Sequence, residues 1–253
     1  MRKILFNLTV LFSLVPFAAL AGPSSFEEDF HRASELYETR EYDEAINRYL
    51  HILDQGMESS ALYFNLGSAY FKNGDLGHAI LHYLRAKRLD PGDDDIASNL
   101  EFAMSFTRVQ MAGVELNPVE HFLETLVEPY RLSTLAWVSS AAFILLICLL
   151  IVRYGIGVQN VGVRTATTVV VVLLVLFTFV SAFKYRHDYL TSRAVLIAQD
   201  CPVRTGPSEQ SDIELEGAPG LVVEILSKSG DYYNVLFQNK RRGWIWKELV
   251  AVV

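Results

Sequence analysis

The chain has 253 residues, of which 51% are hydrophobic, and a formal net charge of −7. Its acidity is uneven, because residues 22–133 contain 20 acidic and 9 basic side chains, whereas residues 188–253 contain 9 and 7. This negative balance argues against nucleic acid as a partner, and the length leaves room for two small domains beside a membrane segment.

The first 21 residues have the pattern of a secretory signal peptide. Arg2 and Lys3 precede an apolar stretch, and Ala19-Leu20-Ala21 has the small-x-small pattern that signal peptidase cleaves. The alternative is an uncleaved anchor. In both interpretations we expect the domain that follows to be exported.

Residues 26–59 and 60–93 are two copies of one 34-residue pattern, in which Tyr49 corresponds to Tyr83. This period is typical of helical repeats. The second copy resembles the tetratricopeptide repeat, since the signature positions of that family are occupied by Tyr63, Leu66, Gly67, Tyr70, Ala79, Tyr83, Ala86 and Pro91. The first copy resembles an atypical terminal repeat.

The resemblance implies an all-α tetratricopeptide repeat domain over residues 22–106, with a closing helix over residues 94–106. Two and a half repeats are marginal alone, so we expect the domain to lean on the membrane face, on a partner or on another copy.

In this family the inner helices present a concave groove to partners. The resemblance implies that the groove binds an extended or helical peptide through Tyr37, Phe64, Asn65, Phe71, Lys72, Asn99 and Phe102. The alternative is that the aromatic residues only pack between repeats.

Two histidines lie four positions apart, His78 and His82, as two metal ligands on one helical face would. No third ligand is apparent near them in the sequence, so we interpret both as part of a solvated face. Asp93-Asp94-Asp95 stands where a helix is predicted to begin, and we interpret it as a capping sequence. We therefore expect no metal and no cofactor.

The linker over residues 107–133 contains a short amphipathic helix, predicted over residues 118–127. We expect this helix to lie in the headgroup layer of a membrane. Docking onto the repeat is the alternative.

Two uncharged apolar runs, residues 134–152 and 166–183, are predicted to be transmembrane helices. Each run would be about 27 to 29 Å long as a helix, the depth of a bilayer's hydrocarbon core. The loop between them, residues 153–165, has Arg153 and Arg164 but no acid, which places it in the cytoplasm. The alternative is two core elements of a soluble domain. We expect a hairpin that keeps both flanking domains on one membrane face.

Residues 190–253 have short β-rich runs separated by turn residues, which predicts a small all-β barrel. The order Val203 to Ser208, then Tyr232 to Val235, then Gly243 to Ile245 resembles the bacterial SH3-like (Src-homology-3-like) domain. Many such domains bind cell-wall peptide, and the resemblance implies that role for Tyr232, Trp244 and Trp246. The alternative, which we favour for Trp244, is that this side chain fills the core.

The two cysteines cannot form a disulfide with each other, because Cys148 lies inside the first apolar run and Cys201 lies beyond the second. Cys201 would be an unpaired thiol in an oxidising compartment and a candidate redox thiol. The alternative, which we favour, is that Cys201 packs as a small hydrophobic residue.

This order of parts resembles the BatE-like family of bacterial aerotolerance (Bat) operons. The resemblance implies an inner-membrane protein with both terminal domains in the periplasm. It also implies partners, which are membrane-anchored von Willebrand A-domain proteins and a MoxR-type ATPase system, and a role in aerotolerance or envelope stress.

The sequence has no recognisable nucleophile elbow, phosphate loop or zinc motif. We therefore expect a non-enzymatic scaffold that is anchored in the lipid bilayer and binds proteins through its tetratricopeptide and SH3-like domains. The alternative is a peptidoglycan-binding anchor that acts through the SH3-like domain.

Overall fold

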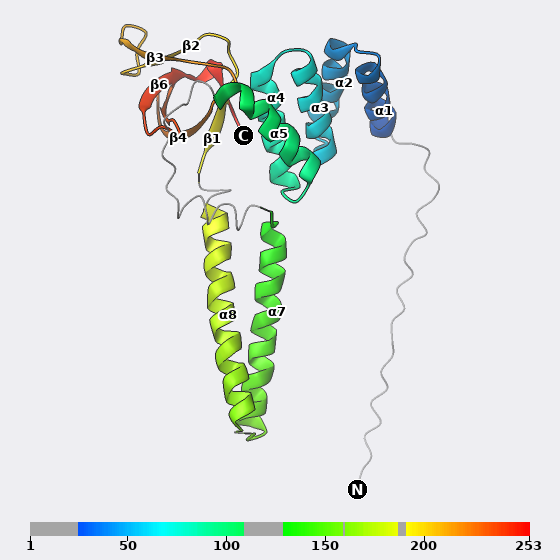
Figure 1. The fold of residues 1–253 in the computed structure, drawn as a ribbon, viewed down its shortest axis with the longest axis vertical. Helices are drawn as coiled ribbons and strands as arrows, with labels where there is room; N and C mark the ends of the chain where they lie inside the picture. The colour runs from blue at the N-terminus through cyan, green and yellow to red at the C-terminus, as the bar shows by residue number, and fades with distance from the viewer. Residues whose placement is uncertain (1–24, 109–128, 159, 187–190) are drawn as a thin grey trace.

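The computed structural model describes residues 25–108, 129–158, 160–186 and 191–253. The predicted signal peptide (1–21) and the predicted amphipathic helix (118–127) lie outside the described residues. Figure 1 shows three parts: a group of short helices, a β-sheet beside it, and a long helical hairpin that extends from both.

The helical group contains α1 (Ser25–Glu38), α2 (Tyr42–Asp54), α3 (Ser60–Lys72), α4 (Leu76–Leu89) and α5 (Asp94–Arg108). Side chains cap the first turns of α3 and α4. Ser59 accepts a hydrogen bond from the amide of Leu62 at the start of α3, and Asp75 accepts one from the amide of His78 at the start of α4. These caps satisfy amides that the helices themselves leave without a partner.

The two helix pairs repeat the same internal contact 34 residues apart. The hydroxyl groups of Ser34 and Tyr49 lie 3.0 Å apart between α1 and α2, and those of Ser68 and Tyr83 lie 3.1 Å apart between α3 and α4. Gly67 lets the second pair approach closely, because a Cβ atom there would lie 2.9 Å from the Tyr83 ring. The repeat seen in the sequence is therefore a repeat of packing.

The hairpin consists of α7 (Leu132–Leu150), a π-helical turn η2 (Ile151–Gly155) and α8 (Val161–Tyr185). The two helices pack side by side, and α8 is capped by Asn160, whose Oδ1 atom accepts a hydrogen bond from the amide of Val163 at 2.8 Å. Both are long and apolar enough to cross a membrane. Their broad exposed apolar surface is what lipid would cover.

The last part is a sheet made of β1 (Arg193–Leu196), β2 (Cys201–Arg204), β3 (Ile213–Gly217), β4 (Val222–Ser229), β5 (Tyr232–Leu236), β6 (Arg242–Trp246) and β7 (Val250–Val252). A single 3₁₀ turn, η4 (Lys247–Leu249), precedes β7. All pairs are antiparallel, in the order β3-β2-β6-β5-β4-β1-β7.

The prediction of a closed barrel is wrong, because the strands form an open sheet. The two strands at the ends of the order, β3 and β7, do not pair with each other in the described part of the chain. The sheet nevertheless encloses a core of its own, formed by Ala194, Leu196, Cys201, Val203, Leu221, Val223, Val235, Phe237, Ile245 and Val250. Helix α4 of the repeat lies against β7, where Arg85 donates to the carbonyl oxygen of Val252.

The repeat and the sheet share a second apolar core. Along β1, Ala194 and Leu196 face the sheet core, whereas Val195 points the other way and is fully buried against Ile80 and Leu81 of α4. Val222, Ala251 and Val253 pack against the same cluster. The repeat is thus packed against the sheet of its own chain. This contact was not among the supports predicted from the sequence.

Two glycines allow this close approach. A Cβ atom on Gly77 of α4 would lie 2.8 Å from the Cα atom of Ile197. Gly220 has a φ of +87°, and a Cβ atom there would lie 2.7 Å from Ile80 and 2.9 Å from Thr107 of α5. Helix α4 therefore approaches the main chain of the sheet at Gly77, and side chains of α4 and α5 approach the main chain of the sheet at Gly220.

The hairpin is joined to the repeat at the turn between α4 and α5. The guanidinium of Arg131, just before α7, pairs with the carboxylate of Asp90 at 2.9 Å. Both the repeat and the sheet lie at the end of the hairpin where α7 begins and α8 ends (Figure 1).

Candidate protein-binding site

Three of the residues predicted to line the groove are packed into the repeat. Tyr37 is half-buried, with its ring edge-on to Tyr42 at 5.6 Å between centroids. Phe64 is half-buried, with its ring 5.8 Å from that of Tyr83. The side chain of Asn65 hydrogen-bonds to Tyr49, whose pKa is raised above its usual value by burial. The ring contacts of Tyr37 and Phe64 lie within single repeats, whereas the bond between Asn65 and Tyr49 joins the two repeats, so the groove role of these residues stays a prediction.

A second set lies at the surface. Phe71 of α3 and Phe102 of α5 have ring centroids 5.6 Å apart, and Phe106 lies 5.8 Å from Phe71 and 5.3 Å from Phe102. The side chains of Phe102 and Phe106 are 57% and 56% exposed. These three residues form what we call the aromatic cluster, which the sequence analysis had identified only in part.

Phe106 was missed as a site residue, although its spacing gave a signal. It follows Phe102 by four positions, and residues four apart lie on the same side of a helix. The structure also brings Phe71 to the pair from another helix, which no spacing rule gives.

The polar candidates lie beside the aromatic cluster. Lys72 is exposed at the end of α3, next to Phe71. Asn99 is half-buried on α5, and its Nδ2 atom donates to the carbonyl oxygen of Asp95 at 2.8 Å. One of the two N–H donors of the Asn99 amide therefore bonds its own helix.

The histidine interpretation is wrong for one of the two residues. His82 is 3% exposed, with its ring stacked on Tyr70 at 5.4 Å and on Tyr63 at 5.8 Å. Burial lowers the pKa of His82 to about 3, with smaller contributions from Arg85 and His78. Its Nδ1 atom has no hydrogen-bond partner among the described residues. A helical spacing cannot tell a buried face from a solvated one.

His78 has a structural partner. Its Nδ1 atom lies 2.7 Å from Oδ2 of Asp75, the residue that caps α4, and its ring stacks on Tyr70 at 4.9 Å. Burial acts to raise the pKa of Asp75, but the hydrogen bonds from His78 outweigh it and leave that pKa lowered. The pair holds the start of α4 in place.

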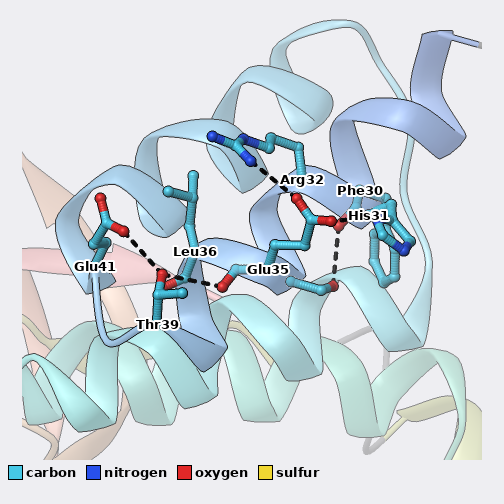
Figure 2. Close-up of polar contacts among 8 residues, drawn as sticks. Phe30, His31, Arg32, Glu35, Leu36, Thr39 and Glu41 are labelled. Carbon is cyan, nitrogen blue, oxygen red and sulfur yellow. Dashed lines mark hydrogen bonds and ion pairs between the residues drawn. The ribbon is translucent and has the colours of Figure 1, made fainter.

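The outer face of α1 is occupied by its own polar contacts, shown in Figure 2. Glu35 accepts from Arg32 at 3.0 Å and lies 3.4 Å from His31. Thr39 donates to the carbonyl oxygen of Leu36 and lies 2.9 Å from a carboxylate oxygen of Glu41. These side chains are largely exposed, and their contacts satisfy the helix end and its surface.

The three aromatic candidates of the sheet share one face. Tyr232 pairs with Trp246 and Asn234 pairs with Trp244, so Tyr232, Trp244 and Trp246 point away from the sheet core. Trp246 is 42% exposed, whereas Gly243 and Ile245 are the buried residues of β6. Our expectation that Trp244 fills the core is therefore wrong, because the register of β6 gives that place to Ile245.

Cys201 is fully buried in the sheet core, with Sγ 3.9 Å from the carbonyl oxygen of Leu249. Burial raises the pKa of its thiol to about 12. A thiol reacts as the thiolate, so these surroundings oppose a redox role and match the packing alternative.

The comparisons with known proteins concern the repeat. The family model of the tetratricopeptide repeat matches residues 30–94, which cover α2, α3, α4 and most of α1. No curated protein matches the chain. Tetratricopeptide domains generally mediate contacts between proteins and are typically not enzymes.

Proposed function

We propose that this protein is a non-enzymatic, membrane-anchored scaffold that binds other proteins through the face formed by α3 and α5. The single observation that carries the proposal is the aromatic cluster. Leaving two neighbouring phenylalanine side chains more than half exposed to water is unfavourable in free energy. Such exposed apolar patches mark interaction sites. Lys72 and Asn99 beside the cluster supply polar contacts for a bound chain.

The site is proposed to lie in the periplasm of a bacterium. Residues 1–21 would be a signal peptide, the two apolar helices would cross the inner membrane, and the connection with Arg153 and Arg164 would lie in the cytoplasm. The repeat domain (22–106) and an SH3-like domain (190–253) would then lie on the periplasmic side.

The resemblance to the BatE-like family supports more specific partners. These are the von Willebrand A-domain membrane proteins and the MoxR-type ATPase system of the Bat operons, and the process would be aerotolerance or resistance to envelope stress.

Site-specific photo-crosslinking in cells tests the proposal. A photoreactive phenylalanine analogue replaces Phe102, and the matched control places it at Met57, which is 45% exposed in the turn between α2 and α3. We expect a discrete crosslinked product from position 102 and none from position 57. Equal patterns from the two positions contradict the proposal.

The sheet supports a second candidate function, binding of peptidoglycan. The cross-strand pair of Tyr232 and Trp246 places two aromatic rings on one outer face, as a stacking platform for cell-wall material would need. The full chain in detergent is sedimented with purified cell wall. We expect Trp246→Ala to remain in the supernatant and the control Leu226→Ala, changed at a 40% exposed position of β4, to sediment. A wild-type protein that stays soluble excludes this function.

A further inference from the structure

We infer that the α3–α5 face takes a partner segment of a particular chemistry, an apolar anchor with lysine or arginine near it. The inference rests on the proposed function, because it names the kind of partner for the same face. The anchor contacts the aromatic cluster, and the basic side chains contact the acidic beginning of α5.

Helix α5 carries apolar and acidic side chains on the same side. Phe106, Phe102, Asn99 and Asp95 are separated by four, three and four positions, so they lie on one side of the helix. At about 1.5 Å of rise per residue, Asp95 lies about 10 Å along the helix axis from Phe102. One side of α5 therefore presents an apolar half and an acidic half.

The acids at the start of α5 divide into two kinds. Asp93 is used by the fold, since its Oδ1 atom accepts hydrogen bonds from the amides of Asp95 and Ile96 at 2.9 and 3.1 Å. The side chains of Asp94 and Asp95 are exposed. Asp95 lies on the side of α5 that carries Phe102 and Phe106, and Asp94 adds a second negative charge next to it in the sequence.

The wider charge of the repeat points the same way. Residues 25–108 contain 16 acidic and 8 basic side chains. Two of the basic ones, Arg85 and Arg88, donate to carbonyl oxygens at the end of the sheet. Lys72 is the single basic residue in the sequence of α3. Helix α3 has no acidic residue, so a basic partner is attracted to the beginning of α5 and by the overall negative charge of the repeat.

The position of the aromatic cluster favours a protein segment over a lipid surface. The ion pair between Asp90 and Arg131 fixes the beginning of α5 near the hairpin, and α5 then rises away from the hairpin (Figure 1). Phe106 lies about 18 Å along the helix from Asp94. Thr107, the next residue, contacts the Gly220 turn of the sheet. The apolar end of the face is therefore the end remote from the membrane.

Binding of two fluorescent peptides to the full chain in zwitterionic nanodiscs tests the inference. One is an amphipathic peptide of leucine and lysine, and the other has glutamate in place of lysine. The variants are Phe102→Ser with Phe106→Ser, Asp94→Asn with Asp95→Asn, and the control Met57→Ser. Empty nanodiscs measure binding to lipid, and melting curves verify that each variant is folded.

We expect the lysine peptide to bind the full chain more tightly than the glutamate peptide. The phenylalanine variant should weaken binding about tenfold, and the aspartate variant about threefold at low salt, with the second loss disappearing at high salt. The control should match wild type.

The inference would be overturned by tighter binding of the glutamate peptide, by an aspartate variant that binds like wild type, or by a signal equal to that of empty nanodiscs. Crosslinking of position 102 to a second copy of this chain would also overturn it. A retained crosslink from position 102 to another protein, together with a preference for the glutamate peptide, leaves the proposed function standing and removes only the charge assignment.

Discussion

The Nη2 atom of Arg85 donates a hydrogen bond to the carbonyl oxygen of Val252 at 2.8 Å, which links α4 of the repeat to the final strand of the sheet. The amide of Val253, just after β7, donates to the carbonyl oxygen of Arg193 in β1, so the carbonyl of Val252, one residue earlier, points to the open edge. Arg85 thus occupies an edge that would otherwise pair with another strand.

Removing this cover should weaken the junction and expose the edge. For Arg85→Ala with Arg88→Ala we expect a loss of about 1 to 2 kcal/mol in the free energy of unfolding, since two hydrogen bonds from charged donors are lost at an exposed site. The measurements are urea denaturation and light scattering. Arg32→Ala is the control, because the side-chain bond of Arg32 to Glu35 lies within α1. Equal midpoints for the two variants would contradict the role of the junction.

Adding one methyl group at Gly77 should push the repeat off the sheet. The new Cβ atom would lie 2.8 Å from two main-chain atoms, the Cα of Ile197 and the carbonyl oxygen of Leu196, which cannot move as a side chain can. We expect Gly77→Ala to cost about 2 kcal/mol. Thermal unfolding measures this cost.

Gly162→Ala is the matched control for that experiment. Among the described residues its Cβ atom would meet Oδ1 of Asn160, at an ordinary contact distance of 3.5 Å. Unfolding of Gly77→Ala at the temperature of this control would show that the close approach of α4 to β1 is unimportant.

Burial of neutral His82 predicts a loss of stability in mild acid. Its pKa is about 3 in the folded protein, against the ordinary histidine pKa of 6.5 in the unfolded chain, so the unfolded chain takes up a proton first as the pH falls. The stabilisation is complete above the unfolded pKa and is lost as the pH falls from about 6.5 towards 3. Between about pH 7 and pH 5 the loss should be about 2 kcal/mol.

Replacing the ring should remove this pH dependence. We expect His82→Phe to keep the stack with Tyr70 and to unfold at similar urea concentrations at both pH values, because it has no proton to bind. His51→Phe, changed at an exposed position of α2, should keep the wild-type difference. A wild-type difference retained in His82→Phe would place the titrating group elsewhere.

The burial of Cys201 decides how membrane topology has to be measured. Since this side chain is 0% exposed, we expect a membrane-impermeant maleimide to leave it unlabelled until the protein is unfolded. New cysteines are therefore needed, in a chain with Cys148→Ser and Cys201→Ala, at the exposed positions Gln55, Ser208 and Val158.

In cells with a permeabilised outer membrane, Gln55→Cys and Ser208→Cys should react with the maleimide. Val158→Cys, which lies between α7 and α8, should react only after lysis. Labelling of Val158→Cys before lysis would reverse the proposed orientation.

Local patterns predicted much of the fold. A period of 34 residues identified the helical repeat, and its equivalent positions Ser34 and Ser68 make the same contact with Tyr49 and Tyr83. Uncharged runs identified two helices long and apolar enough for a membrane. These features depend on composition or on residues that are close in sequence, so they can be predicted from the sequence alone.

The sequence by itself thus determined the helical repeat, the two apolar helices and the β-rich end of the chain. Only the tertiary structure decided which faces of these elements are covered. It buried His82, turned Trp244 away from the sheet core, and placed Val195 against α4 across more than a hundred residues of chain. It also brought Phe71 to Phe102 and Phe106 at the surface. The physical reason is that periodicity defines the faces of a helix or strand, whereas burial depends on the element that packs against each face.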